Sequence, residues 1–255
     1  MPHTRIEEFG DLLEVKEYQI TPEFHGTSKK KKRKRNRNAD DRAQRYRRAD
    51  NLWKLAERFT RIVRSNIGAT APPALVTLTM LEILGIRQSY GAFSVFIQRL
   101  RARTKGSFRH IAVPEFQKRG AVHFHVLIWG LSESLYDSPK GMETEAADLR
   151  ESINRGIQNL WQRGFADSIS TDGSFKLAGY LAKYMRKAMH DKRLLGQKAY
   201  TASRNILRPV LRKTAEEFDD VSEYYLKGYD SVPLKDKTFE TKWLGKGRRR
   251  LFKKL

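Results

Sequence analysis

The sequence predicts an α+β fold in which helices flank a central antiparallel sheet. Two patterns support this prediction: β-branched and aromatic runs bounded by turn residues, and longer segments whose apolar residues recur every three or four positions. An apolar content of 39% in 255 residues can supply one sizeable core, and a charged content of 31% indicates polar extensions around it. We therefore expect one folded domain with appended basic segments.

The predicted elements follow from these patterns along the chain. A basic amphipathic helix is expected over residues 41–68, because apolar side chains recur at helical spacing among many arginines before the break at Pro72 and Pro73. The remaining elements are expected as strands over 75–80, 110–116 and 121–131, as helices over 90–103, 143–163 and 175–188, and as short strands over 198–202 and 238–243.

The charge of the chain points to a polyanionic partner. The net charge is +22, and residues 29–48 hold twelve Lys or Arg against two Asp, while residues 242–255 add seven with no acid. Such an excess repels itself unless phosphates or counterions neutralise it. We expect nucleic acid as the partner, with an anionic membrane surface as the second candidate, and a flexible basic arm as the form of the N-terminal charge run.

The composition also excludes several classes of protein and site. The chain has no Cys, which excludes disulfides, thiolate zinc sites and cysteine nucleophiles, so a bound metal must have nitrogen and oxygen ligands. No apolar run approaches the roughly 20 residues of a membrane span, and the first ten residues do not resemble a signal peptide. We expect a cytoplasmic protein whose partner is nucleic acid and not the second candidate, a membrane.

Two histidines give the first candidate site. His123 and His125 are separated by one residue inside a β-prone run, so their side chains should share one face of a strand. Two imidazoles on one face suit a divalent metal. The alternative is that both are polar residues on a solvated face, with Phe124, Val126 and Ile128 packed on the core.

The turn between the two predicted strands decides which residue lies opposite His123. A three-residue loop, Lys118-Arg119-Gly120, pairs Gln117 with Ala121 and puts Glu115 opposite His123. Two imidazoles and one carboxylate would form an open ligand set suited to Mg²⁺ or Mn²⁺. A two-residue loop would instead send Glu115 to the other face.

A pair of tyrosines gives the second candidate. On a helix, Tyr180 and Tyr184 are one turn apart on one face, with Lys183 beside them. A tyrosine can attack a phosphodiester and hold the DNA end as a phosphotyrosine, and a neighbouring Lys can lower the phenol pKa or offset charge on the phosphate. The alternative is ordinary aromatic packing beside a solvated lysine.

Together these motifs resemble the rolling-circle replication initiators, the Rep branch of the His-hydrophobe-His (HUH) endonuclease superfamily, of the phage and plasmid type with two tyrosines. The resemblance covers roughly residues 75–210. It is carried by the strand at 75–79, the segment from Glu115 to His125, the helix end at 160–165, the tyrosine helix at 180–184 and the segment 200–205. The segment from Glu115 to His125 is the most specific match.

The resemblance implies a sheet of about five antiparallel strands with the two-histidine strand central and the tyrosine helix over it. It implies a nickase that cuts single-stranded or hairpin origin DNA with Mg²⁺ or Mn²⁺, forms a 5′-phosphotyrosine and rejoins strands. By this resemblance, the metal ligands are His123, His125 and Glu115, and the catalytic residues are Tyr180 as nucleophile, Tyr184 as second tyrosine and Lys183. The third ligand varies in the superfamily.

The domain organisation expected on this basis has four parts. Residues 1–40 form a flexible N-terminal region with the basic arm, 41–68 the basic helix, 70–215 the HUH endonuclease domain, and 216–255 a C-terminal extension with a basic tail. No Walker-type glycine loop occurs, so we expect a host helicase and the host replication machinery as partners, in a bacterial cytoplasm.

Two other functions remain open from the sequence. A single-strand DNA transposase or a relaxase would share the metal and phosphotyrosine chemistry. A non-catalytic basic nucleic-acid-binding protein would use only the charged segments, and its histidines would be structural.

Overall fold

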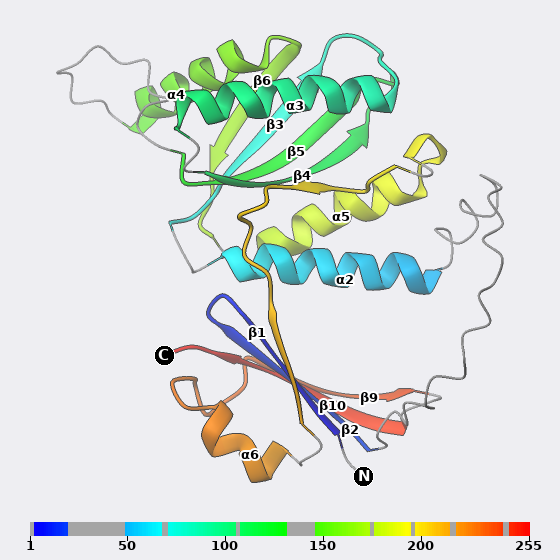
Figure 1. Cartoon of the computed structure of the whole chain (residues 1–255), viewed down its shortest axis with the longest axis vertical. Helices are drawn as coiled ribbons and strands as arrows, with labels where there is room; N and C mark the ends of the chain where they lie inside the picture. The colour runs from blue at the N-terminus through cyan, green and yellow to red at the C-terminus, as the bar shows by residue number, and fades with distance from the viewer. Residues whose placement is uncertain are drawn as a thin grey trace. The chain divides into compact units, whose positions relative to one another are not determined.

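The computed structural model describes residues 3–19, 49–67, 71–105, 108–131, 146–173, 176–194, 197–214, 218–241 and 245–255. The chain divides into two compact units (Figure 1). The larger unit comprises residues 38–63 and 70–206, and the smaller comprises 1–37, 64–69 and 207–255. Each unit contains a five-stranded antiparallel sheet, which confirms the α+β class and adds a sheet that the sequence did not predict.

The larger unit is built on a sheet with the strand order β6-β3-β5-β4-β7. The two-histidine strand β5 lies at its centre. The strands are β3 (Ala74–Met80), β4 (Arg109–Phe116), β5 (Val122–Trp129), β6 (Gly164–Ser170) and β7 (Thr201–Ala202). Strand β6 was missed because its sequence is rich in small and polar residues, which have low β-propensity.

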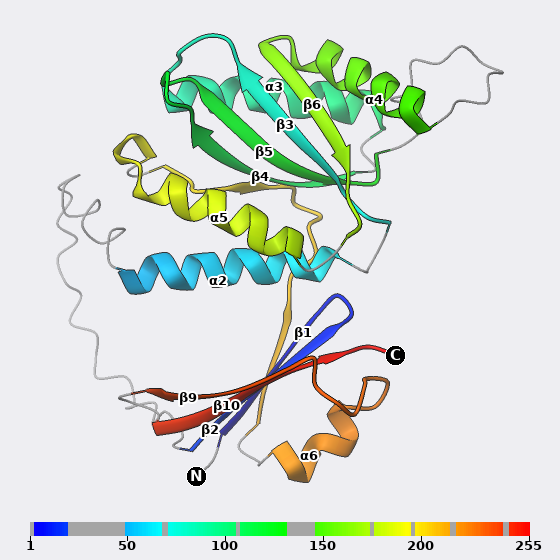
Figure 2. The same cartoon turned by 180° about the vertical axis from the view of Figure 1, so that it is seen from behind.

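Helices cover both faces of this sheet. Helices α3 (Ile86–Arg103) and α4 (Ala146–Trp161) lie on one face, and α5 (Lys176–His190) lies on the other, as the two opposite views show (Figures 1 and 2). The main core forms between the sheet and α3 and α4. Its central residues include Leu78, Phe93, Phe96, Phe124, Val126 and Trp161, each almost completely buried.

The start of β6 requires a glycine. Gly164 has φ +145°, and a Cβ there would overlap the carbonyl oxygen of Thr79. The adjacent chain is held by the Trp161 indole, which donates to the same carbonyl at 2.9 Å, and by a bond from Leu81 N–H to the Arg163 carbonyl at 2.9 Å. This close backbone approach fixes β6 beside β3.

Two further short elements complete the larger unit. The turn η2 (Lys192–Leu194) follows α5. Helix α2 (Ala49–Asn66) belongs to this unit as far as residue 63, and its Phe59 makes an edge-to-face ring contact with Tyr200. The predicted helix over 41–68 is therefore confirmed over 49–66, and residues 41–48 lie outside the described residues.

The smaller unit has the strand order β8-β1-β2-β10-β9. A cluster of buried residues, Ile6, Leu13, Val15 and Phe252, packs with Tyr225 at the end of α6. The elements are β1 (His3–Phe9), β2 (Leu12–Tyr18), β8 (Val210–Thr214), α6 (Phe218–Tyr225), β9 (Lys235–Thr241) and β10 (Gly245–Lys253).

The prediction of a flexible region over 1–40 is wrong for residues 3–18, which form the β1–β2 hairpin around Gly10. Strand β2 gains its other neighbour from the C-terminus, since it pairs with β10. No local pattern reveals a pairing between segments more than 200 residues apart. The basic arm at 29–37 lies outside the described residues.

The predicted basic tail at the C-terminus is instead the strand β10. Its three consecutive arginines each meet a carboxylate: Arg248 bonds Asp236 at 2.6 Å, Arg249 bonds Glu14 at 2.6 Å and Arg250 bonds Glu17 at 2.6 Å. These side chains serve the sheet as ion pairs, so they are not the free tail expected from the sequence.

No helix in the described part of the chain combines the length and apolar character needed to cross a membrane.

Candidate active site

The β4–β5 hairpin has the predicted register. The loop consists of residues 118–120, Gly120 has φ +94°, and Gln117 N–H donates to the Ala121 carbonyl at 2.9 Å. Glu115 pairs directly with His123. Because side chains alternate along a strand, Glu115, His123 and His125 share one face of the sheet.

The next strands extend this arrangement across the sheet. His123 pairs with Thr79 of β3, which pairs with Phe165 of β6, and these side chains project from the same face. His125 pairs in the same way with Thr77, and Thr77 with Asp167. Phe165 is 67% exposed, so this part of the face presents an aromatic ring to solvent.

Helix α5 covers the β4 side of this face. Leu177, Ala178, Leu181, Ala182, Met185 and Ala188 form its buried stripe, at the 3.6-residue spacing of an amphipathic helix. Tyr180, Tyr184 and Lys187 form a second stripe at i, i+4 and i+7 beside the buried one. The amphipathic pattern of the helix therefore directs both phenols and one ammonium group to the two-histidine face.

The two predicted motifs meet through Tyr184. Its ring stacks on the imidazole of His125, with centroids 3.9 Å apart and an interplanar angle of 27°. Its hydroxyl shares a hydrogen bond with the hydroxyl of Tyr180 at 2.9 Å. Tyr180 itself is 43% exposed, and Lys183 is exposed beside it. Tyr184 thus contacts the histidine pair directly, and Tyr180 is linked to it through Tyr184.

Glu115 is the centre of the polar contacts. One carboxylate oxygen bonds Nε2 of His125 at 2.7 Å, and the other forms an ion pair with Lys187. Lys187 is not part of the motifs predicted from the sequence. Its position one turn after Tyr184 on the same stripe was the signal that could have identified it.

Burial controls the charge of this cluster. It lowers the pKa of His125 more than the Glu115 hydrogen bond raises it, and burial together with the charge of His125 lowers the pKa of His123. Burial raises the pKa of Glu115, but hydrogen bonds from Lys187 and His125 outweigh it, so the net pKa is lowered. Neutral imidazoles and an ionised carboxylate are the forms that ligate metals.

The phenol of Tyr180 is held protonated. Its hydrogen bond with Tyr184, followed by burial and by the charges of Tyr184 and Glu115, raises its pKa to about 12, although the charge of Lys183 acts to lower it. The net shift is opposite to the activation that the sequence analysis expected from Lys183. A nucleophilic role for Tyr180 at neutral pH would therefore require loss of its proton during the reaction.

The residue types, but not their present arrangement, match a divalent cation site. Nε2 of His123 is buried and has no hydrogen-bond partner among the described residues, as expected of a nitrogen kept for a ligand. Glu115 and His125 are instead bonded to each other. The described residues contain no group of three or more His, Asp or Glu placed to hold a metal together.

A known protein family matches part of the chain. The model of the replication-associated protein ORF2/G2P family matches residues 73–189, which include every candidate site residue named above and somewhat under half of the chain. No curated protein and no solved structure matches the chain. The match supports a role in the initiation of replication.

Proposed function

We propose, starting from this similarity to replication-associated proteins, that the chain is an initiator that nicks single-stranded origin DNA through a tyrosine and rejoins the ends. One observation carries the proposal: the stacking of Tyr184 on His125 brings the tyrosine helix against the two-histidine strand. The HUH site requires this juxtaposition of two motifs that lie 55 residues apart in the sequence.

The proposed reaction forms one bond and breaks another at the scissile phosphate. The phenol oxygen of Tyr180 bonds to phosphorus, the bond from phosphorus to the 3′ oxygen breaks, and the 3′ oxygen leaves as a hydroxyl. The proton lost from Tyr180 passes through solvent to the departing 3′ oxygen, and the Tyr184 hydroxyl, 2.9 Å from that of Tyr180, orients the phenol. In a second transfer, Tyr184 attacks the scissile phosphate of the regenerated origin and frees a new 3′-hydroxyl. That hydroxyl attacks the Tyr180 phosphotyrosine, which closes the displaced strand and restores the phenol of Tyr180.

The proposed metal ligands are His123, His125 and Glu115. A bound Mg²⁺ or Mn²⁺ would supply positive charge to the non-bridging oxygens of the phosphate. The unpartnered Nε2 of His123 supports this assignment. Lys187 neutralises Glu115 in the cation-free arrangement, and its ammonium would be released toward the DNA when the carboxylate takes a cation.

We also propose a path for the single-stranded DNA across the sheet. Phe165 lies in the same cross-strand row as His123, with Thr79 between them, and strands in a sheet lie about 4.8 Å apart. An exposed phenyl ring about two strands from the site suits stacking on a base that flanks the scissile phosphate.

The test uses the full chain and single-stranded oligonucleotides that cover its replicon, with Mn²⁺. We expect a covalent protein–DNA adduct and a fragment that ends in a free 3′-hydroxyl. The matched control is Tyr224→Phe, because Tyr224 is 70% exposed in the smaller unit and should leave the adduct unchanged.

Binding without an adduct would contradict the proposal. If that binding also needs no metal and weakens steeply with salt, the protein is a basic DNA-binding protein without this chemistry.

A further inference from the structure

A pocket lies on the face of the larger sheet opposite the candidate active site. Its walls come from α3, from β4 and from residues 197–201, and its volume is about 430 Å³. That volume is within the range of about 300–1,000 Å³ typical of small-molecule sites. His110 of β4 lines the pocket and Glu115 of β4 belongs to the active site, so the two sites use opposite faces of one strand.

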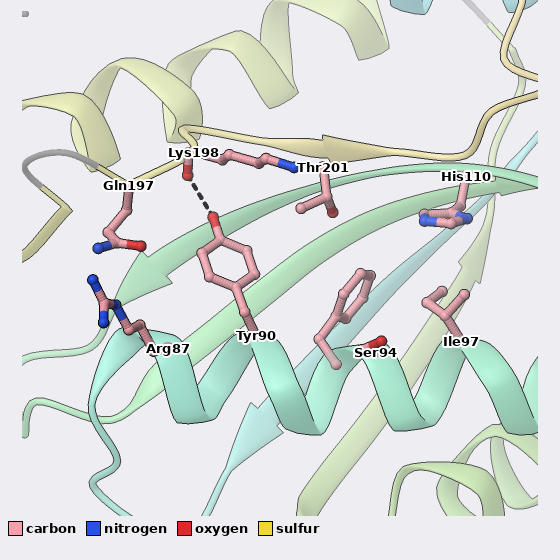
Figure 3. Close-up of a pocket in the computed structure, with 9 residues that line it drawn as sticks. Arg87, Tyr90, Ser94, Ile97, His110, Gln197, Lys198 and Thr201 are labelled. Atoms are coloured by element: carbon pink, nitrogen blue, oxygen red, sulfur yellow. Dashed lines mark hydrogen bonds between the residues drawn. The ribbon is translucent and has the colours of Figure 1, made fainter.

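The pocket combines apolar walls with unused polar atoms. Phe93 supplies apolar surface. Tyr90 and Ile97, seen in Figure 3, extend it. Nδ1 of His110, a residue 95% buried, and Oγ1 of Thr201 are buried and have no hydrogen-bond partner among the described residues. Buried polar atoms of native proteins are nearly always paired, so two unpaired atoms in one pocket indicate a ligand with polar edges.

The interior of the pocket is uncharged. Burial, followed by the charge of Arg101, lowers the pKa of His110 to about 4, so the imidazole is neutral at physiological pH and offers one donor and one acceptor. A buried anionic or cationic group would therefore find no counter-charge inside. A planar, neutral ligand with donors and acceptors on its edge fits these walls.

The rim of the pocket is cationic. Arg87 and Lys198 are exposed lining residues from opposite walls, and both are visible in Figure 3. The backbone carbonyl of Lys198 accepts a hydrogen bond from the Tyr90 hydroxyl, which ties this segment to α3. The Lys198 side chain runs toward Thr201, so the ammonium and the Arg87 guanidinium lie at different parts of the rim, and each suits a phosphate (Figure 3).

We propose that this pocket binds one unpaired nucleotide, with the base against the rings of Tyr90, Phe93 and His110 and the phosphate at the cationic rim. The proposal goes beyond the nicking site, since it does not require the tyrosines or a metal. The nucleotide can belong to a single strand of DNA held by the protein or can be free in solution, and the two sources are separated by experiment.

The experiment cross-links the full chain to single-stranded DNA that carries 5-iodouracil at successive positions, and maps the labelled peptide by mass spectrometry. Trypsin releases residues 88–99, which contain Tyr90 and Phe93, as one peptide. We expect label on this peptide. Ser94→Phe fills the pocket from an exposed lining position and should reduce the label at least about fivefold, the low end of base-stacking energies.

Two control variants make the result specific. Val95→Phe adds the same ring to the neighbouring residue of α3, which is exposed and does not line the pocket, so its label should equal that of the wild type. Tyr180→Phe should also keep the label, which separates this site from the proposed nicking reaction. Binding of a DNA strand in this pocket is overturned if the Ser94→Phe variant keeps the label. It is also overturned if peptide 88–99 of the wild type carries no label.

A second arm titrates free thymidine monophosphate into the protein in a calorimeter. If thymidine monophosphate reduces the cross-linking of DNA to peptide 88–99, the result supports one site shared by the free nucleotide and the DNA strand. A different outcome is binding heat that Ser94→Phe abolishes while no cross-link to DNA forms. That outcome assigns the pocket to a free nucleotide and overturns the assignment to a nucleotide of a DNA strand. If neither binding heat nor a cross-link is observed, the nucleotide assignment is overturned altogether.

Discussion

The imidazole of His125 lies between the carboxylate of Glu115 and the ring of Tyr184, with 2.7 Å from Nε2 to the carboxylate and 3.9 Å between ring centroids. The hydrogen bond to Glu115 restricts rotation of the imidazole within its own plane, and the stacking on Tyr184 restricts the tilt of that plane. One side chain of β5 therefore contacts both the acidic residue of β4 and the tyrosine helix. Changes at this cluster should alter its chemistry more than the stability of the fold.

Tyr184→Phe should lower the pKa of Tyr180 from about 12 toward the ordinary value near 10, because the hydrogen bond between the two hydroxyls is the largest cause of the shift. The phenyl ring keeps the stacking on His125. The measurement is a pH titration of ¹³C-labelled tyrosine by NMR, with Tyr180→Phe used to assign the resonance. An unchanged pKa would show that burial, rather than the hydrogen bond, dominates.

Lys187→Met should tighten binding of Mn²⁺ about two- to fivefold, because the ammonium and the cation compete for the Glu115 carboxylate and an exposed pair of this kind is weak. Isothermal titration calorimetry measures the affinity. The control is Arg186→Met, which removes an exposed charge from the adjacent position of α5. Weaker binding in Lys187→Met would mean that Lys187 holds Glu115 in the position that the cation needs.

Gly164→Ala should destabilise the protein by about 3 kcal/mol or more, because the new Cβ overlaps a backbone oxygen that cannot move without separating β6 from β3. Gly179→Ala is the matched control on α5. A Cβ there meets nothing within 4 Å, so it should stabilise the protein by about 0.5–1 kcal/mol. Denaturant unfolding measures both, and a mild effect at Gly164 would contradict the close approach of the two strands.

His110 should make the protein sensitive to acid. Its pKa of about 4 in the folded state lies below the ordinary 6.5, so the unfolded chain takes up the proton first as the pH falls. The associated stability is present above pH 6.5 and is lost as the pH falls to 4, at a cost of roughly 3 kcal/mol. His110→Gln should lose correspondingly less in unfolding free energy between these pH values, and equal losses would contradict the burial of the imidazole.

The sequence predicted those parts of the site that depend on local periodicity. The alternation of β5, the loop of residues 118–120 and the i, i+4 spacing of Tyr180 and Tyr184 are properties of short segments, and the structure has each of them. The contact between the segments was inferred only through the family resemblance. Spacing alone does not say which tyrosine meets His125.

Other features depended on contacts that no local pattern encodes. The raised pKa of Tyr180 arises from its hydrogen bond with Tyr184, and the role of Lys187 arises from the packing of α5 on β4. The smaller sheet joins strands from both ends of the chain, so its N-terminal hairpin was taken for a flexible region and β10 for a tail. In each case the partner lies far away in the sequence.

The most direct test of the central claim is the identity of the residue that carries DNA in the covalent adduct. Trypsin cuts after Lys183 and separates the two tyrosines into the peptides 177–183 and 184–186. With an origin oligonucleotide and Mn²⁺, mass spectrometry should find the first-formed phosphotyrosine on peptide 177–183, and Tyr180→Phe should abolish it. DNA attached to any residue outside α5, or a full yield of adduct in the double variant Tyr180→Phe, Tyr184→Phe, would contradict the account.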